Sequence, residues 1–185
     1  MTELSGCDLI VDATADPHVF NYCSAVARKH TRPMVWAEVF GGGIGGIVAR
    51  ARPDIDPSPQ VARRQITAWC EAKGTPAPSS LTVDYSSSNP VDTAAPLVAD
   101  DGDVGVVAAH ATRLITDTLT RADKSIFPQS AYAIGLSRGW IFSAPFQTWP
   151  IDYFPEGHWS EPVDPDSSEH VIRLLEELSA DGETE

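Results

Sequence analysis

Three polar residues, Asp12, Thr14 and Asp16, occupy alternate positions directly after the apolar run Leu9–Val11. A short run of this kind is typical of a strand buried on both faces of a parallel sheet. Ligands of open α/β sheets bind just beyond the carboxyl ends of such strands. Carboxylate and hydroxyl oxygens at this place could therefore bind a nucleotide. The alternative is that Asp12 and Thr14 bond to nearby backbone and only shape the end of the strand.

Asp16 is a candidate helix N-cap. It precedes Pro17, and an acidic residue followed by proline is typical of a helix N-cap and first helical position.

The cysteines and histidines show no spacing for a metal site. Three cysteines, at positions 7, 23 and 70, predict a reducing compartment without a disulfide framework. Cys70 is expected near the end of a helix beside Trp69 and Glu71, where nothing lowers its pKa. Neither the cysteines nor the five histidines show the spacing of a zinc site.

The elements that position these residues alternate in type. Helical spacing predicts a helix over 17–30, and residues 34–40 predict a second strand, which together make a βαβ unit. Gly41–Gly46 fits the pattern G-x-G-x-x-G of dinucleotide loops, but that pattern requires a helix to follow. Residues 47–52 instead alternate as a strand does, so we interpret the glycines as a hairpin.

The later elements are less regular. We expect a helix over 61–73, a pattern-poor stretch over 74–103 with a short strand at 81–83, and a helix over 103–121 capped by Asp103. Residues 132–134 and 140–142 predict a second hairpin. Residues 153–185 are expected to form a C-terminal extension, with a short helix over 167–178 and an acidic tail.

Composition excludes some functions. The chain has 185 residues, with 26 acidic and 13 basic side chains and a formal net charge of −13. Such a balance argues against nucleic acid as a partner, because phosphates need clustered Lys and Arg. No apolar run approaches the roughly 20 residues of a membrane span, and the N-terminus lacks the basic start of a signal peptide. We expect no membrane partner and a cytoplasmic protein.

Several segments resemble one known family. They are CDLIVDATADP (7–17), PMVWAEVFGGGIGGIVARARP (33–53) and PLVADDGDVGVVAAHATRL (96–114). Over residues 6–152 they look like the C-terminal half of a bacterial ThiF-type adenylating domain, the family of ubiquitin-activating enzymes. The resemblance implies a Rossmann-like α/β fold. It also implies activation, with ATP and Mg²⁺, of the C-terminus of a ubiquitin-like or sulfur-carrier protein.

The resemblance implies roles for individual residues. Asp12 and Thr14 would bind the nucleotide, Asp16 would help to hold Mg²⁺, and Cys70 would be the cysteine that forms a thioester. The residues themselves favour a buried packing role for Cys70, and for Asp16 the cap and the Mg²⁺ role have equal weight. The chain departs from the family pattern at Ala15, which stands where many members carry the metal-binding acid.

The family's glycine-rich nucleotide loop would precede Asp8 and is absent from this sequence. Two functions remain open. The chain could be an incomplete adenylyltransferase that is active only with an N-terminal half supplied in trans. The isolated chain would then bind neither ATP nor Mg²⁺. Alternatively, it is a non-catalytic binding or dimerisation module, and in either case a homo- or heterodimer is expected.

Overall fold

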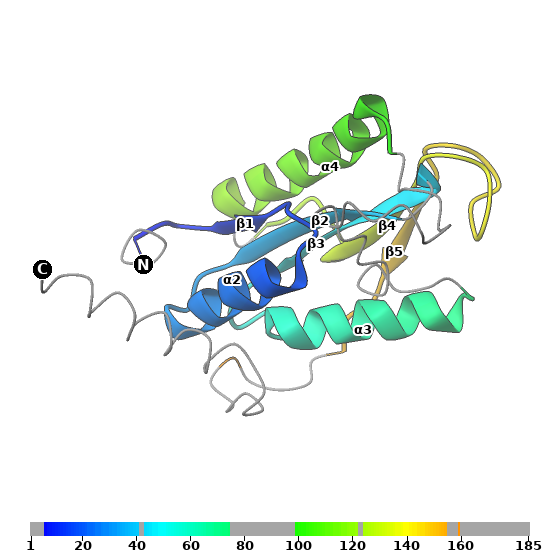
Figure 1. Ribbon diagram of the computed structural model, residues 1–185. Coiled ribbons are helices and arrows are strands. Elements are labelled where there is room, and N and C mark those ends of the chain that lie inside the picture. The colour runs from blue at the N-terminus through cyan, green and yellow to red at the C-terminus, as the bar shows by residue number, and fades with distance from the viewer. Residues whose placement is uncertain (1–5, 41–42, 75–98, 122–123, 155–158, 160–185) are drawn as a thin grey trace, which may run out of the picture.

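The computed structural model describes residues 6–40, 43–74, 99–121, 124–154 and 159. They form an α/β structure with a five-stranded mixed sheet in the order β1-β2-β3-β4-β5 (Figure 1). The strands are β1 (Ile10–Asp12), β2 (Met34–Val39), β3 (Gly45–Ala51), β4 (Ala131–Gly135) and β5 (Thr148–Ile151). The helices of the described ranges are α2 (Pro17–Lys29), α3 (Pro59–Ala72) and α4 (Asp101–Thr120).

The predicted βαβ unit is confirmed. β1 and β2 are parallel, with Ile10 opposite Met34 and Asp12 opposite Trp36, and α2 connects them. Pro17 begins α2 at the first helical position, where its missing N–H costs no hydrogen bond.

The hairpin interpretation of the glycines is also confirmed. β2 and β3 are antiparallel, with Met34 opposite Ala51 and Val39 opposite Gly46. Gly43 has a φ of +64°, the left-handed conformation that glycine adopts without steric cost, and its N–H donates to the Phe40 carbonyl at 3.2 Å. A strand follows the turn, so these glycines do not open a helix as a dinucleotide loop does.

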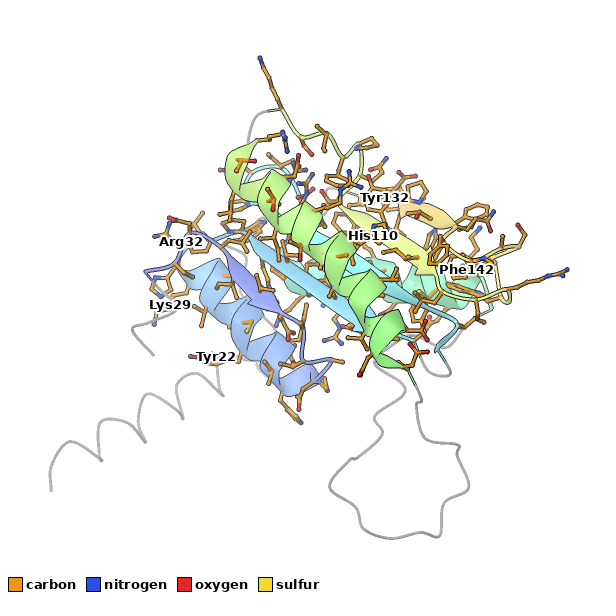
Figure 2. All side chains as sticks on the ribbon, turned by 90° about the horizontal axis from the view of Figure 1, so that it is seen from above. Tyr22, Lys29, Arg32, His110, Tyr132 and Phe142 are labelled. Atoms are coloured by element: carbon orange, nitrogen blue, oxygen red, sulfur yellow. The ribbon has the colours of Figure 1, made fainter. Side chains whose placement is uncertain are left out.

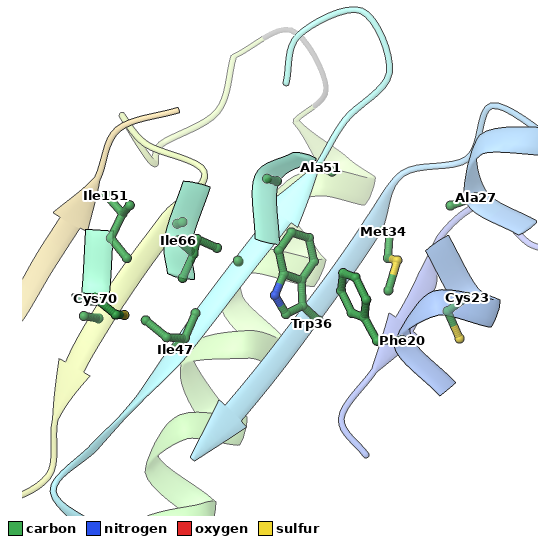
Figure 3. Close-up of a cluster of buried hydrophobic side chains, with 14 of the residues drawn as sticks. Phe20, Cys23, Ala27, Met34, Trp36, Ile47, Ala51, Ile66, Cys70 and Ile151 are labelled. Carbon is green, nitrogen blue, oxygen red and sulfur yellow. The ribbon is translucent and has the colours of Figure 1, made fainter. Parts of the chain in front are cut away.

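Helices cover both faces of the sheet. α2 and α3 lie on one face and α4 on the other (Figure 1). The core under α2 and α3 includes Phe20 and Trp36, whose rings meet edge to face at 5.4 Å between centroids (Figure 3). The smaller core under α4 consists of Val48, Val107, Ala111, Ile134 and Leu136.

A buried ion pair joins α4 to the central strand. Arg50 on β3 and Asp117 on α4 are both fully buried, with Nη1 and Oδ2 2.8 Å apart. Arg50 also donates to the hydroxyls of Thr118 at 3.2 Å and Ser125 at 2.7 Å. Ser125 Oγ donates in turn to Asp117 Oδ2 at 2.6 Å. Arg50 Nε donates to the Ser130 hydroxyl at 3.4 Å. The charge of the guanidinium is thus compensated by one carboxylate and three hydroxyls, which is what a buried charge requires.

Two predictions about the later elements were wrong. The N-cap of α4 is Asp100, whose Oδ1 accepts from the Asp103 N–H at 2.8 Å, so Asp103 lies within the first turn. The strand that pairs with β4 is residues 148–151 and not 140–142. Gly139 and Phe142 bridge each other instead and close a local turn in which Trp140 has a φ of 52°. The expected strand at 81–83 and helix at 167–178 lie outside the described residues.

None of the helices in the described ranges is long and apolar enough to span a membrane.

Candidate functional site

The polar residues after β1 are bonded to one another. Asp12 is 5% exposed, and its Oδ1 accepts from the Thr14 N–H at 3.0 Å and the Thr14 hydroxyl at 2.7 Å. Thr14 Oγ1 accepts in turn from the Asp16 N–H at 3.2 Å. Between them Ala15 has a φ of 56°, a conformation uncommon outside glycine. These contacts form a tight turn that directs the chain from β1 into α2. The nucleotide-binding role of Asp12 and Thr14 stays a prediction.

Asp16 caps α2. Its Oδ1 accepts from the backbone N–H groups of His18 at 2.7 Å and Val19 at 3.2 Å, two donors that have no partner within the helix. The described residues contain no group of three or more acidic, histidine or cysteine side chains placed to hold a metal ion. The cap interpretation of Asp16 is therefore confirmed, while its Mg²⁺ role stays a prediction.

We expect Asp16→Ala to lower the free energy of unfolding by roughly 1 kcal/mol, because it removes both cap bonds. Asp16→Asn keeps an acceptor oxygen and should change that free energy by only a few tenths of a kcal/mol. Urea unfolding followed by circular dichroism measures both. Equal losses in the two variants would show that the negative charge of Asp16, and not the cap, is what stabilises α2.

Glu38 and Arg63 are a pair that the sequence analysis missed. Glu38 lies near the carboxyl end of β2 at 8% exposure, and its Oε1 is 2.7 Å from Arg63 Nη2 of α3. Arg63 also stacks on Phe20, with Cζ 4.2 Å from the ring centroid. Burial raises the pKa of Glu38, Arg63 lowers it, and the charge of Asp12 raises it further. The signal was present: an acid within the otherwise apolar run of residues 34–40 needs a buried cation.

Cys70 is packed in the core. It is fully buried on α3, on the side that faces the sheet with Ile66 (Figure 3). Burial, together with the charges of Glu38 and Glu71, raises the pKa of its thiol to about 11. A thiol with this pKa is neutral at pH 7, whereas the nucleophile is the thiolate. The catalytic role predicted for Cys70 has no support from its surroundings.

The outer edge of β1 carries backbone groups that lack a strand partner. The Ile10 N–H donates to the Pro33 carbonyl at 3.0 Å, so the amides of Ile10 and Asp12 face β2. Successive residues of a strand direct their backbone groups to opposite sides, so the N–H and C=O of Val11 point away from β2. Within the described ranges, β1 is the first strand of the sheet and no strand pairs with this edge.

The side chain of Val11 is uncovered as well. It is 48% exposed, whereas Val35, its neighbour on β2, is fully buried. Both valines are on the α4 side of the sheet, but α4 packs over β2 and β3, and β1 lies beside it (Figure 2). Strands that pair in parallel are normally covered on both faces. The half-exposed Val11 therefore marks a place where another element can pack against β1.

The comparisons with known proteins found little similarity. No protein-family model and no curated protein matches the chain. A solved structure described as the crystal structure of SeMet PaaA is similar with a TM-score of 0.43 and 13% sequence identity, over 80% of this chain. The chain spans 43% of the length of that PaaA chain.

Since no family model matches the chain, the predicted membership of the ThiF-type family is wrong and we withdraw it. What the structure shows is an α/β fold with a five-stranded mixed sheet and, in the described ranges, three helices. The motifs that suggested the family are explained by this fold alone. A strand, a capped helix and a glycine hairpin produce the same local patterns in unrelated proteins.

Proposed function

We propose that this chain is a non-catalytic binding module, and that a strand of another polypeptide binds along the outer edge of β1. The observation that carries this proposal is that the backbone of Val11 pairs with no strand of the described ranges, beside its half-exposed side chain. An edge of this kind is a template for strand addition, in which main-chain hydrogen bonds supply affinity.

The chemistry at the strand ends supports a non-catalytic role. The Asp12 carboxylate is engaged by Thr14, Asp16 caps α2, and Glu38 is paired with Arg63. A general base or nucleophile must be free to reach a substrate and must hold the right protonation state. Cys70 meets neither condition, since it is buried and its pKa is raised.

The composition of β1 supports strand addition. Natural sheets blunt exposed edges with very short strands, charged side chains, proline or a bulge. β1 is short and carries Asp12, but it has no proline and is in regular register with β2. The Asp12 side chain lies on the opposite face from Val11 and is bonded to Thr14, so it leaves the outward backbone groups of Val11 able to pair.

We expect Val11→Pro to abolish binding at this edge and to leave the fold intact. Proline removes the outward N–H, and it is tolerated on edge strands where that group makes no ladder bond. Val11→Thr is the matched control, since it keeps the N–H and the β-branched shape. Thermal unfolding of both variants should follow the wild type closely.

The binding test uses a random-peptide phage library selected on the immobilised wild-type chain. Enriched peptides should bind the wild type and Val11→Thr and should lose binding to Val11→Pro. Amide hydrogen exchange should show that an enriched peptide slows exchange at Val11. If the enriched peptides bind Val11→Pro as tightly as the wild type, the β1 edge is not the binding site.

A further inference from the structure

We infer that the natural occupant of the β1 edge is a second copy of this chain, paired antiparallel across a two-fold axis. This inference rests on the proposed function, because it names the partner of the same edge. The pairing of the two β1 strands would join two five-stranded sheets into one continuous sheet.

The backbone geometry of β1 is self-complementary. A two-fold axis brings the same patch of each copy together and requires the two strands to run in opposite directions. With Val11 opposite its equivalent, each Val11 N–H can donate to the other copy's Val11 carbonyl, the hydrogen-bonded pair of an antiparallel ladder. Both groups point outward in the single chain, as such a pair requires.

The side chains fit the same arrangement. Opposite residues of an antiparallel pair lie on the same face of the sheet. The two Val11 side chains would therefore meet on the α4 side, where α4 leaves β1 uncovered (Figure 2). Each would bury part of the surface that is exposed in the single chain, where Val11 is 48% exposed.

Charge also favours the antiparallel arrangement. Val107 lies next to Gly46 at the start of β3, and Asp117 pairs with Arg50 near its end, so α4 runs in the same direction as β3. Because β3 is antiparallel to β2, α4 runs opposite to β1 and β2. The start of α4 therefore lies at the carboxyl ends of β1 and β2. The acidic residues at this end include Asp12, Asp16, Asp100, Asp101 and Asp103, beside Glu38, which is paired with Arg63.

Basic residues gather at the opposite end of the sheet, which also holds Asp8 before β1 and Asp54 and Asp56 after β3. Lys29 ends α2 and Arg32 follows it, and both lie next to the start of β1 (Figure 2). Arg121 and Lys124 follow the end of α4 at the same end of the sheet. An antiparallel pair places the acidic end of each copy beside the basic end of the other.

The first experiment measures self-association of the full chain by sedimentation velocity between roughly 1 and 300 µM, the range in which a small interface associates. We expect a monomer–dimer equilibrium. Val11→Pro should weaken it at least about tenfold, and Val11→Thr should stay within about threefold of the wild type.

The second experiment tests the geometry by oxidative cross-linking. In the proposed pair the two Cα atoms of residue 11 are about 5.5 Å apart, within the range of about 4.4–6.8 Å that a disulfide spans. Val11→Cys should therefore form a covalent dimer on mild oxidation. Val104→Cys is the matched control, since Val104 is also a valine at 48% exposure but lies on α4.

Two results would overturn the inference: a monomer at every concentration, or equal cross-linking of the Val11→Cys and Val104→Cys variants. Neither result contradicts the proposed function if library peptides still distinguish Val11→Pro from Val11→Thr. If those peptides fail to distinguish them, the edge itself is not a binding site.

Discussion

Asp117→Asn is expected to lower the free energy of unfolding by about 3–5 kcal/mol, the cost of leaving a buried charge without its partner. Arg50 and Asp117 are both fully buried, so the guanidinium cannot recover the loss from water. Chemical denaturation at pH 7 measures the effect. The control is Arg121→Ala, which removes the other arginine near Asp117. That arginine is 46% exposed and 3.7 Å away, so the loss should stay below about 1 kcal/mol.

The same ion pair predicts a dependence on pH. Burial raises the pKa of Asp117, but hydrogen bonds from Ser125, Arg50 and the Ile126 N–H, with the charge of Arg50, outweigh it and leave the pKa below its ordinary value of 3.8. A carboxyl whose pKa is lowered by folding stabilises the fold above its unfolded pKa and loses that effect as pH falls through the lowered value. The difference in the free energy of unfolding between wild type and Asp117→Asn should therefore shrink as the pH falls below the ordinary value of 3.8. A difference that stays constant as the pH falls would show that the Asp117 charge contributes nothing.

Replacing Arg50 and Asp117 together distinguishes charge from shape. Arg50→Met with Asp117→Leu leaves no unpaired charge, and such double replacements are often neutral or stabilising. We expect the double variant to be more stable than Asp117→Asn alone. If it is less stable, the polar network of Thr118 and Ser125 contributes more than the ion pair does.

Gly45→Ala is expected to lower the free energy of unfolding by about 1–3 kcal/mol or more, because the added methyl group has no room. Its Cβ would lie 2.5 Å from the Ile134 carbonyl oxygen and 2.9 Å from the Phe142 ring. The carbonyl belongs to the backbone of β4, which cannot move without breaking its pairing with β3. Thermal and urea unfolding measure the loss.

Gly105→Ala is the matched control for Gly45→Ala. Gly105 lies within α4, and a methyl group added there meets no atom within 4 Å. Alanine is the better helix former by about 0.5–1 kcal/mol, so this variant should be more stable than the wild type. Destabilisation by both variants would mean that steric contact at Gly45 is not the cause.

The elements with strong local signals could be predicted from the sequence. The apolar run before Asp12, the acid–proline start of α2 and the alternation after the glycines each carry their own physical reason. The second strand of the later hairpin could not be predicted in this way. Both Trp140–Phe142 and Thr148–Ile151 offer short apolar stretches, and the choice depends on which of them reaches β4 across the sheet.

The candidate site was predicted only in part. Asp12, Thr14 and Asp16 were recognised because they follow one another closely, but their bonds to the backbone and to one another depend on the turn itself. Glu38 and Arg63 are far apart in sequence and meet only because α3 packs on the sheet. The edge of β1, which no other described strand covers, could not be predicted at all, because the order of the strands is a property of the assembled sheet.

The order of the strands in the sheet has a consequence for how the chain folds. Each strand pairs with the next strand along the chain, so β1, β2 and β3 can assemble from nearby residues. The single distant step is the joining of β3 to β4, between Ala51 and Ala131, with α3 and α4 in the intervening chain. Closing this long loop reduces the conformational entropy of the chain before the β3–β4 hydrogen bonds can form. We therefore expect this closure to limit the folding rate, with the first three strands already paired when it occurs.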